Sequence, residues 1–177
     1  GLLRTGPLFG ATTGWPRAGA FIQQRLLLAG FRGAPTSYRF SEVASLWSFR
    51  GVVDPPTADR AFGGSLDVDD IEIVNEVFVG RHLQIFTEAG EWFAEAVALD
   101  ATHPLAFRRS TSHGIVRGVP VVFSDGATLF VQKGGRTLRD FIFSDAEQSY
   151  TAEPLSVLAP HHMTGVMDVA SRAARSV

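Results

Sequence analysis

The sequence LQIFTEAGEWFA, residues 83–94, predicts a β-hairpin and indicates the fold class of the whole chain. Two runs of mostly apolar residues, 83–87 and 91–94, flank the short turn Glu88-Ala89-Gly90. Aromatic and β-branched residues favour strands, and a short connection that contains Gly is typical of a hairpin. We therefore expect the two runs to pair in antiparallel fashion.

A second hairpin is expected near the N-terminus, where residues 20–22 and 26–30 flank the polar turn Gln23-Gln24-Arg25. A helix over 18–30 is the alternative, because Leu and Gln favour helices. Residues 36–40 alternate in polarity and are expected to form an edge strand. Further strands are predicted at residues 71–74, 119–123, 128–132, 137–143 and 166–170.

Less regular structure is expected between these strands. Residues 1–17 are rich in Gly and Thr and are predicted to be an irregular lead-in to a β-rich region over 18–177. Residues 50–70 contain Pro-Pro and Gly-Gly pairs and are expected to form a long loop. One or two short helices are expected, at 41–49 and 153–162.

The composition agrees with a packed domain. Hydrophobic residues make up 45% of the 177 residues, which argues against disorder. The formal net charge of −2 gives no electrostatic reason to expect the chain to wrap nucleic acid. There is no Cys, so disulfides and thiolate metal sites are excluded. No apolar run approaches the roughly 20 residues that a membrane-spanning helix needs.

A weak internal repeat indicates the architecture. The turn region that begins at Phe86 aligns with a second one that begins 45 residues later at Val131. A strand–turn–strand unit that returns every 40–50 residues or so is typical of propeller blades. Three to four such units would fit in the chain, whereas closed propellers need about four to eight. We therefore expect an all-β fold of antiparallel hairpins, a partial β-propeller-like fragment of a larger protein.

Acidic residues near position 70 are the weak candidates for a metal site. Asp67, Asp69 and Asp70, followed by Glu72, form the densest acidic cluster, and carboxylates on a loop could bind Ca²⁺. The cluster lacks the Gly and the distal Glu of an EF-hand loop. A solvated loop that pairs with Arg residues is therefore the favoured interpretation, and we predict no metal and no cofactor.

Carboxylates beside aromatic residues raise the possibility of a glycosidase. Glu88, Glu91 and Glu95 flank Trp92, and glycosidases use two such carboxylates. In a hairpin, Glu91 and Glu95 share one face, whereas Trp92 lies on the other. We favour Trp92 in the core and the Glu residues in solvent. Nucleophile-elbow and zinc-binding motifs are absent from the sequence, so no enzyme is predicted.

Three stretches in order resemble large virion proteins of tailed phages and prophages. The resemblance rests on Gly14–Ala18 with Phe21, Gln24–Leu26 and Ala29-Gly30; on Ile85–Trp92; and on Leu129–Phe141, followed by Ser149–Ala152, Leu155–Ala159 and His161 or His162. It spans residues 14–170. The family is more distantly similar to the tail-tube nozzle and DNA-stabilising tail proteins of short-tailed phages.

This resemblance implies a function that the residues alone do not give. It implies a non-enzymatic virion structural component, assembled in the host cytoplasm and located in the tail. It also implies a propeller-like β fold, a ring of identical copies expected to be hexameric, contacts with other tail proteins and transient passage of DNA. The alternatives are a carbohydrate-binding or carbohydrate-cleaving propeller for host attachment, and a β interaction module of a cellular protein.

Overall fold

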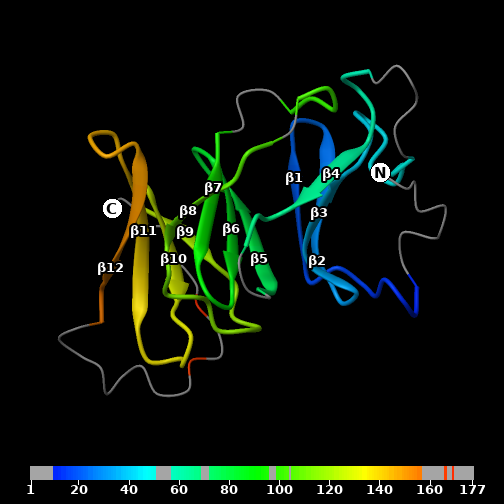
Figure 1. Cartoon of the computed structure of the whole chain (residues 1–177). Coiled ribbons are helices and arrows are strands. Elements are labelled where there is room, and N and C mark those ends of the chain that lie inside the picture. The colour runs from blue at the N-terminus through cyan, green and yellow to red at the C-terminus, as the bar shows by residue number, and fades with distance from the viewer. Residues whose placement is uncertain are drawn as a thin grey trace, which may run out of the picture.

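The computed structural model describes residues 10–50, 57–68, 72–95, 99–103, 105–156, 166 and 169. Within these residues the protein is all-β, with three four-stranded antiparallel sheets and no helix (Figure 1). The expected fold class, built from antiparallel hairpins, is therefore confirmed. The described residues contain no helix, and therefore none that is long and apolar enough to cross a membrane.

Each sheet is a meander of four consecutive strands. The first sheet comprises β1 (Ala18–Ile22), β2 (Arg25–Phe31), β3 (Ala34–Phe40) and β4 (Phe62–Ser65). The second comprises β5 (Val74–Val79), β6 (Leu83–Thr87), β7 (Glu91–Ala94) and β8 (Arg108–Thr111). The third comprises β9 (Val122–Ser124), β10 (Ala127–Val131), β11 (Leu138–Ser144) and β12 (Ser149–Pro154). Four-stranded meanders of this kind are the blades of propellers.

The three sheets follow one another in a stack, and the described residues do not close into a ring (Figure 1). The second sheet, drawn in green, lies between the other two. The internal repeat predicted from the sequence corresponds to a repeat in the structure. The pair β6–β7 is central in the second sheet, and the pair β10–β11 is central in the third. The 45-residue interval thus relates equivalent hairpins of neighbouring sheets.

Two separate hydrophobic cores hold the stack together. The core between the first two sheets includes Leu27 and Phe40 from one sheet and Ile85 and Trp92 from the other. The core between the second and third sheets is largely aromatic, with Phe86, Phe93, Phe130, Phe141 and Tyr150. Successive residues of a strand point to opposite faces. Neighbouring residues of β6 and β7 therefore serve different cores.

The Ser110 hydroxyl is one of the groups that join the edges of the second and third sheets. Ser110 on β8 accepts a hydrogen bond from the backbone N–H of Tyr150 at 2.9 Å and lies 2.8 Å from the carbonyl oxygen of the same residue. β12 is an edge strand, and the Ser110 hydroxyl is a hydrogen-bond partner for the backbone N–H and carbonyl of Tyr150 on its outer edge. The two sheets are therefore linked by a polar contact as well as by their core.

The N-terminal hairpin has the connection that twisted strands favour. β1 and β2 pair in register from Ala18↔Ala29 to Ile22↔Arg25, which leaves a two-residue turn. Gln23 and Gln24 both have positive φ, 46° and 60°, as a type I′ turn requires. The hairpin prediction is confirmed and the alternative helix over 18–30 is wrong.

The strand that follows is not at an edge, contrary to our prediction. β3 pairs with β2 on one side and with β4 on the other. β4 lies inside the region 50–70 predicted as a loop, where its two Gly residues had indicated a turn. A Cβ at Gly63 would lie 2.3 Å from the carbonyl oxygen of Tyr38, so this strand pairing needs Gly at that position.

Other local predictions also need correction. Residues 41–49 form turns rather than a helix: Glu42 and Ser45 make a bridge around Ala44, which has a φ of 56°. β5 begins at Val74, so the strand predicted at 71–74 is displaced toward the C-terminus. Residues 157–162 of the second predicted helix lie outside the described residues, and residues 153–154 belong to β12. The strand predicted at 166–170 lies almost wholly outside them.

Candidate functional site

The described residues of the acidic run near position 70 differ in their exposure to solvent. Asp67 is exposed, whereas Asp69 and Asp70 lie outside the described residues. Glu72 is 3% exposed and points into the protein. Within the described parts of the chain, no three His, Asp or Glu side chains come together in a way that could hold a metal ion.

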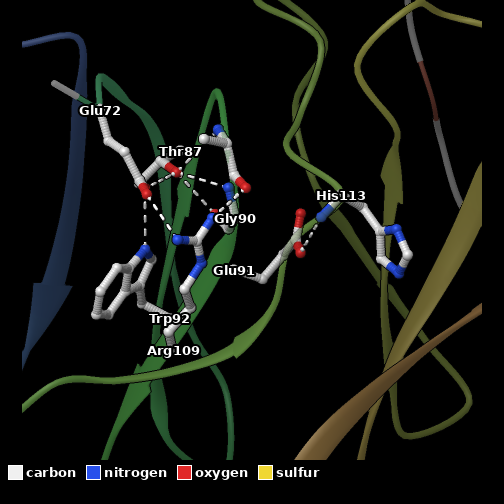
Figure 2. Close-up of polar contacts among 8 residues, drawn as sticks. Glu72, Thr87, Gly90, Glu91, Trp92, Arg109 and His113 are labelled. Carbon is white, nitrogen blue, oxygen red and sulfur yellow. Dashed lines mark hydrogen bonds and ion pairs between the residues drawn. The ribbon is translucent and has the colours of Figure 1, made fainter. Parts of the chain in front are cut away.

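Glu72 is the centre of a buried polar cluster beside the β6–β7 turn (Figure 2). Its carboxylate accepts hydrogen bonds from the Thr87 hydroxyl at 2.6 Å and from the Trp92 indole Nε1 at 3.2 Å. Its other oxygen, Oε1, lies 3.2 Å from Nη1 of Arg109. A buried carboxylate is costly unless its oxygens are paired, and here both are. The cluster joins the segment before β5 to β6, β7 and β8.

The same cluster fixes the conformation of the β6–β7 turn. The Thr87 hydroxyl accepts hydrogen bonds from the backbone N–H groups of Ala89 and Gly90, at 3.2 and 2.9 Å. Arg109 donates to the carbonyl oxygen of Ala89 at 2.6 Å, and its guanidinium lies 5.7 Å from the centre of the Trp92 ring. The turn is thus held from both sides by side chains that also bind Glu72. This arrangement is structural support for a hairpin.

Glu91 is buried, contrary to the prediction that it faces solvent. It is fully inaccessible on the face of β7 that meets the third sheet, while Trp92, as predicted, is in the core on the opposite face. Glu91 Oε2 accepts a hydrogen bond from the Thr111 hydroxyl at 2.5 Å. It also accepts one from the backbone N–H of His113 at 3.2 Å (Figure 2). The prediction assumed one solvated face, whereas the second sheet is covered on both.

Glu91 and Glu95, two of the carboxylates considered for a glycosidase, lie in different environments. Glu95 is exposed and lies 3.1 Å from Nη2 of Arg108, whereas Glu91 is buried between two sheets. A glycosidase needs both carboxylates to reach the same bond of a sugar substrate. The described geometry of Glu91 and Glu95 therefore lends no support to that chemistry.

The sequence has two short basic stretches, at Arg108-Arg109 and at Arg136 and Arg139, and three of these four side chains are engaged with protein groups. Arg108 and Arg109 pair with Glu95 and Glu72, and Arg139 donates to the side chain of Gln132 and to a backbone carbonyl oxygen. Arg136 is exposed, and within the described residues no carboxylate lies at ion-pair distance from it. Basic side chains thus contribute to the fold more than to a continuous charged surface.

The histidines do not form a common site in the described structure. His103 is exposed, and its Nδ1 lies 2.9 Å from Asp100. Hydrogen bonds from Thr102 and then from His103 lower the pKa of Asp100 to about 2. His161 and His162 lie outside the described residues.

Sequence reasoning missed one buried cation and the partners of Glu72. Arg25, predicted as part of a polar turn, is 1% exposed. Its guanidinium donates to the carbonyl oxygens of Ser41 at 2.6 Å, Arg60 at 2.8 Å and Ala58 at 2.5 Å. Burial lowers its pKa. A charged residue at the end of a polar turn gave no signal of burial.

Comparison of the chain with models of protein families, and with curated proteins, finds no match in either case.

Proposed function

We propose that this chain is a non-enzymatic structural component of a tailed-phage or prophage virion. In this proposal it is a nozzle-type or tail-tube protein, present as a ring of copies expected to be hexameric, in contact with other tail proteins. The ring forms part of the channel through which DNA leaves the capsid. The ordered resemblance over residues 14–170 supports the identity of the assembly. The structure supports the more general role of an assembly subunit.

The observation that carries the proposal is a large exposed apolar side chain on each outward face of the stack. Phe21 points away from the first core and is 68% exposed, and Ile142 points away from the second core and is 44% exposed. Trp47, in the turns after β3, is 83% exposed. We infer that these side chains are contact points for further copies of the chain.

The distribution of cations fits a wall along which DNA moves. Affinity for DNA grows with the number of basic side chains that neutralise phosphates. Here Arg25, Arg108, Arg109 and Arg139 are engaged with carboxylate, amide or carbonyl oxygens of the protein, and the formal net charge is −2. Such a wall would hold passing DNA weakly, as rapid transit requires.

An antibody against this chain tests the proposal on particles purified from the organism that encodes it. We expect gold-labelled antibody to mark the tails, and mass spectrometry of the particles to detect the chain at several copies per tail. The proposal would be overturned if tailed particles were produced and lacked the chain. It would equally be overturned if the chain were found only in the particle-free fraction.

A further inference from the structure

His82 lies in the interface between the second and third sheets. It belongs to the β5–β6 connection and is half-buried against three aromatic rings. The ring centres of Phe143, Phe93 and Tyr150 lie 4.5, 5.6 and 5.7 Å from that of the imidazole. Phe143 and Tyr150 belong to the third sheet. The imidazole therefore takes part in the packing of one sheet against the other.

One hydrogen bond ties the imidazole to the third sheet. Nδ1 of His82 lies 3.1 Å from the hydroxyl oxygen of Tyr150, whose side chain is 4% exposed. The Tyr150 hydroxyl also interacts with the side-chain amide of Gln84, a residue of β6 that is 2% exposed. Burial raises the pKa of Tyr150, so the hydroxyl keeps its proton at neutral pH. A neutral imidazole can accept that proton at Nδ1, whereas a protonated one cannot.

The charges around His82 come from every element packed against it. Arg81 lies beside it in sequence, with its guanidinium 4.6 Å from the centre of the Phe143 ring, and Arg108 of β8 lies 4.8 Å from that of Phe93. Each cation has a carboxylate partner: Asp145 of the β11–β12 turn lies 2.6 Å from Arg81, and Glu95 lies 3.1 Å from Arg108.

These surroundings disfavour a charged imidazole. Burial is the largest cause that lowers the pKa of His82, and Arg81 and Arg108 lower it further, whereas Glu95 and Asp145 raise it. The net shift is downward from the ordinary value of 6.5. The folded state therefore binds a proton at this site less readily than the unfolded chain does. Its contribution to stability is complete above pH 6.5 and is lost as the pH falls below that value.

We propose that His82 is a pH-sensitive latch between the second and third sheets. The latch is closed while the imidazole is neutral and accepts the hydrogen bond from Tyr150. Protonation replaces that acceptor with an Nδ1–H donor, so the Tyr150 hydroxyl, which already interacts with the Gln84 amide, must reverse its role. It also places a third cation beside Arg81 and Arg108, and both changes loosen the packing of the third sheet. The core between the first and second sheets is hydrophobic, and we expect that contact to respond less to pH. This inference does not depend on the proposed function.

Hydrogen exchange measured by mass spectrometry at pH 7.5 and pH 5.5 tests the latch. Rates are corrected for the intrinsic pH dependence of exchange, and peptides that cover β10–β12 are compared with peptides that cover β2–β3. We expect protection of β10–β12 to fall at least about twofold at pH 5.5 relative to that of β2–β3, because local opening is linked to proton uptake. Equal protection of both regions at both pH values would overturn the proposal.

Two substitutions separate His82 from other titrating groups. His82→Phe keeps an aromatic ring but cannot titrate, and we expect it to abolish the pH dependence of β10–β12. His103→Gln removes an exposed histidine outside the interface and should leave that dependence unchanged. If His82→Phe keeps the wild-type pH response, the proposal is wrong.

A pH titration of the wild-type protein tests the proposal even if the His82→Phe variant does not fold. In the proton NMR spectrum the ring signals of His82 should shift with a midpoint below the ordinary pKa of 6.5. A midpoint at or above 6.5 would contradict the proposal.

Discussion

Glu72 shows how one buried carboxylate can organise a hairpin. It is held by a hydroxyl, an indole N–H and a guanidinium from three different strands, and it supports the β6–β7 turn through Thr87. Its position after an acidic run had indicated a solvated loop. The structure places it in the interior because its partners come from residues 15 to 37 positions further along the chain, which local sequence patterns do not reveal.

We predict that Glu72→Gln lowers the free energy of unfolding by about 2 kcal/mol, because hydrogen bonds to a charged group are worth about 1.5–3 kcal/mol each. The amide oxygen can keep both hydrogen bonds at the Oε2 position, but the amide nitrogen then faces Arg109, which loses its anion. The measurement is urea denaturation at pH 7. Glu95→Gln is the matched control, since the exposed pair with Arg108 should contribute less than about 1 kcal/mol. Equal losses in the two variants would contradict this account.

Arg25 stabilises backbone rather than a ligand. Its guanidinium binds three carbonyl oxygens that belong to the segments after β3 and before β4. A lysine has one nitrogen and cannot reproduce this planar fork. We predict that Arg25→Lys lowers the free energy of unfolding by about 1–3 kcal/mol, the cost of buried acceptors without donors. Arg32→Lys, at an exposed position, should change it by less than about 0.5 kcal/mol. Chemical denaturation of both variants checks the difference.

The β1–β2 turn carries a measurable strain at the scale of the element. Gln24 has a φ of 60°, a conformation that costs an L-residue other than Gly, Asn or Asp about 1–2 kcal/mol. Its side chain is exposed, and only its carbonyl oxygen bonds elsewhere, to the N–H of Ala44. We predict that Gln24→Gly raises the thermal midpoint and that Gln24→Val lowers it. Differential scanning calorimetry checks both, and an increase for the valine variant would contradict the assigned turn.

Several elements were predictable from local pattern. Alternation of apolar residues and short polar turns located the hairpins at 20–30, 83–94 and 128–143. These hairpins use neighbouring segments of the chain, so their signals are local. The Asp125-Gly126 turn between β9 and β10 likewise has positive φ at both positions, 48° and 84°.

The elements that were missed pair with strands far along the chain or have weak patterns. β4 contains two Gly residues and joins β3 across a long connection, and β8 (Arg108–Thr111) has no large apolar residue. The segment 41–49, predicted as a short helical turn that carries Trp47 and Phe49, forms turns instead, and Trp47 is exposed. Tertiary pairing decides such segments, and local propensity does not.

At the scale of the whole molecule, the stack explains both the success and the failure of the site predictions. Placement of Trp92 in the core followed from alternation along β7. Placement of Glu91 failed because alternation assumes one covered face, whereas the second sheet has a neighbour on each side. The first and third sheets have a neighbour on only one side among the described residues, and they expose Phe21 and Ile142.

The central claim is that these outward faces belong to an assembly of copies. Sedimentation velocity at increasing protein concentration tests it most directly, with the wild-type chain compared with the Phe21→Ser/Ile142→Ser double variant. We predict that the wild type forms one discrete closed oligomer, and that the double variant is monomeric with an unchanged β-sheet circular dichroism spectrum. A wild type that stays monomeric up to its solubility limit would contradict the claim, as would a double variant that assembles equally well.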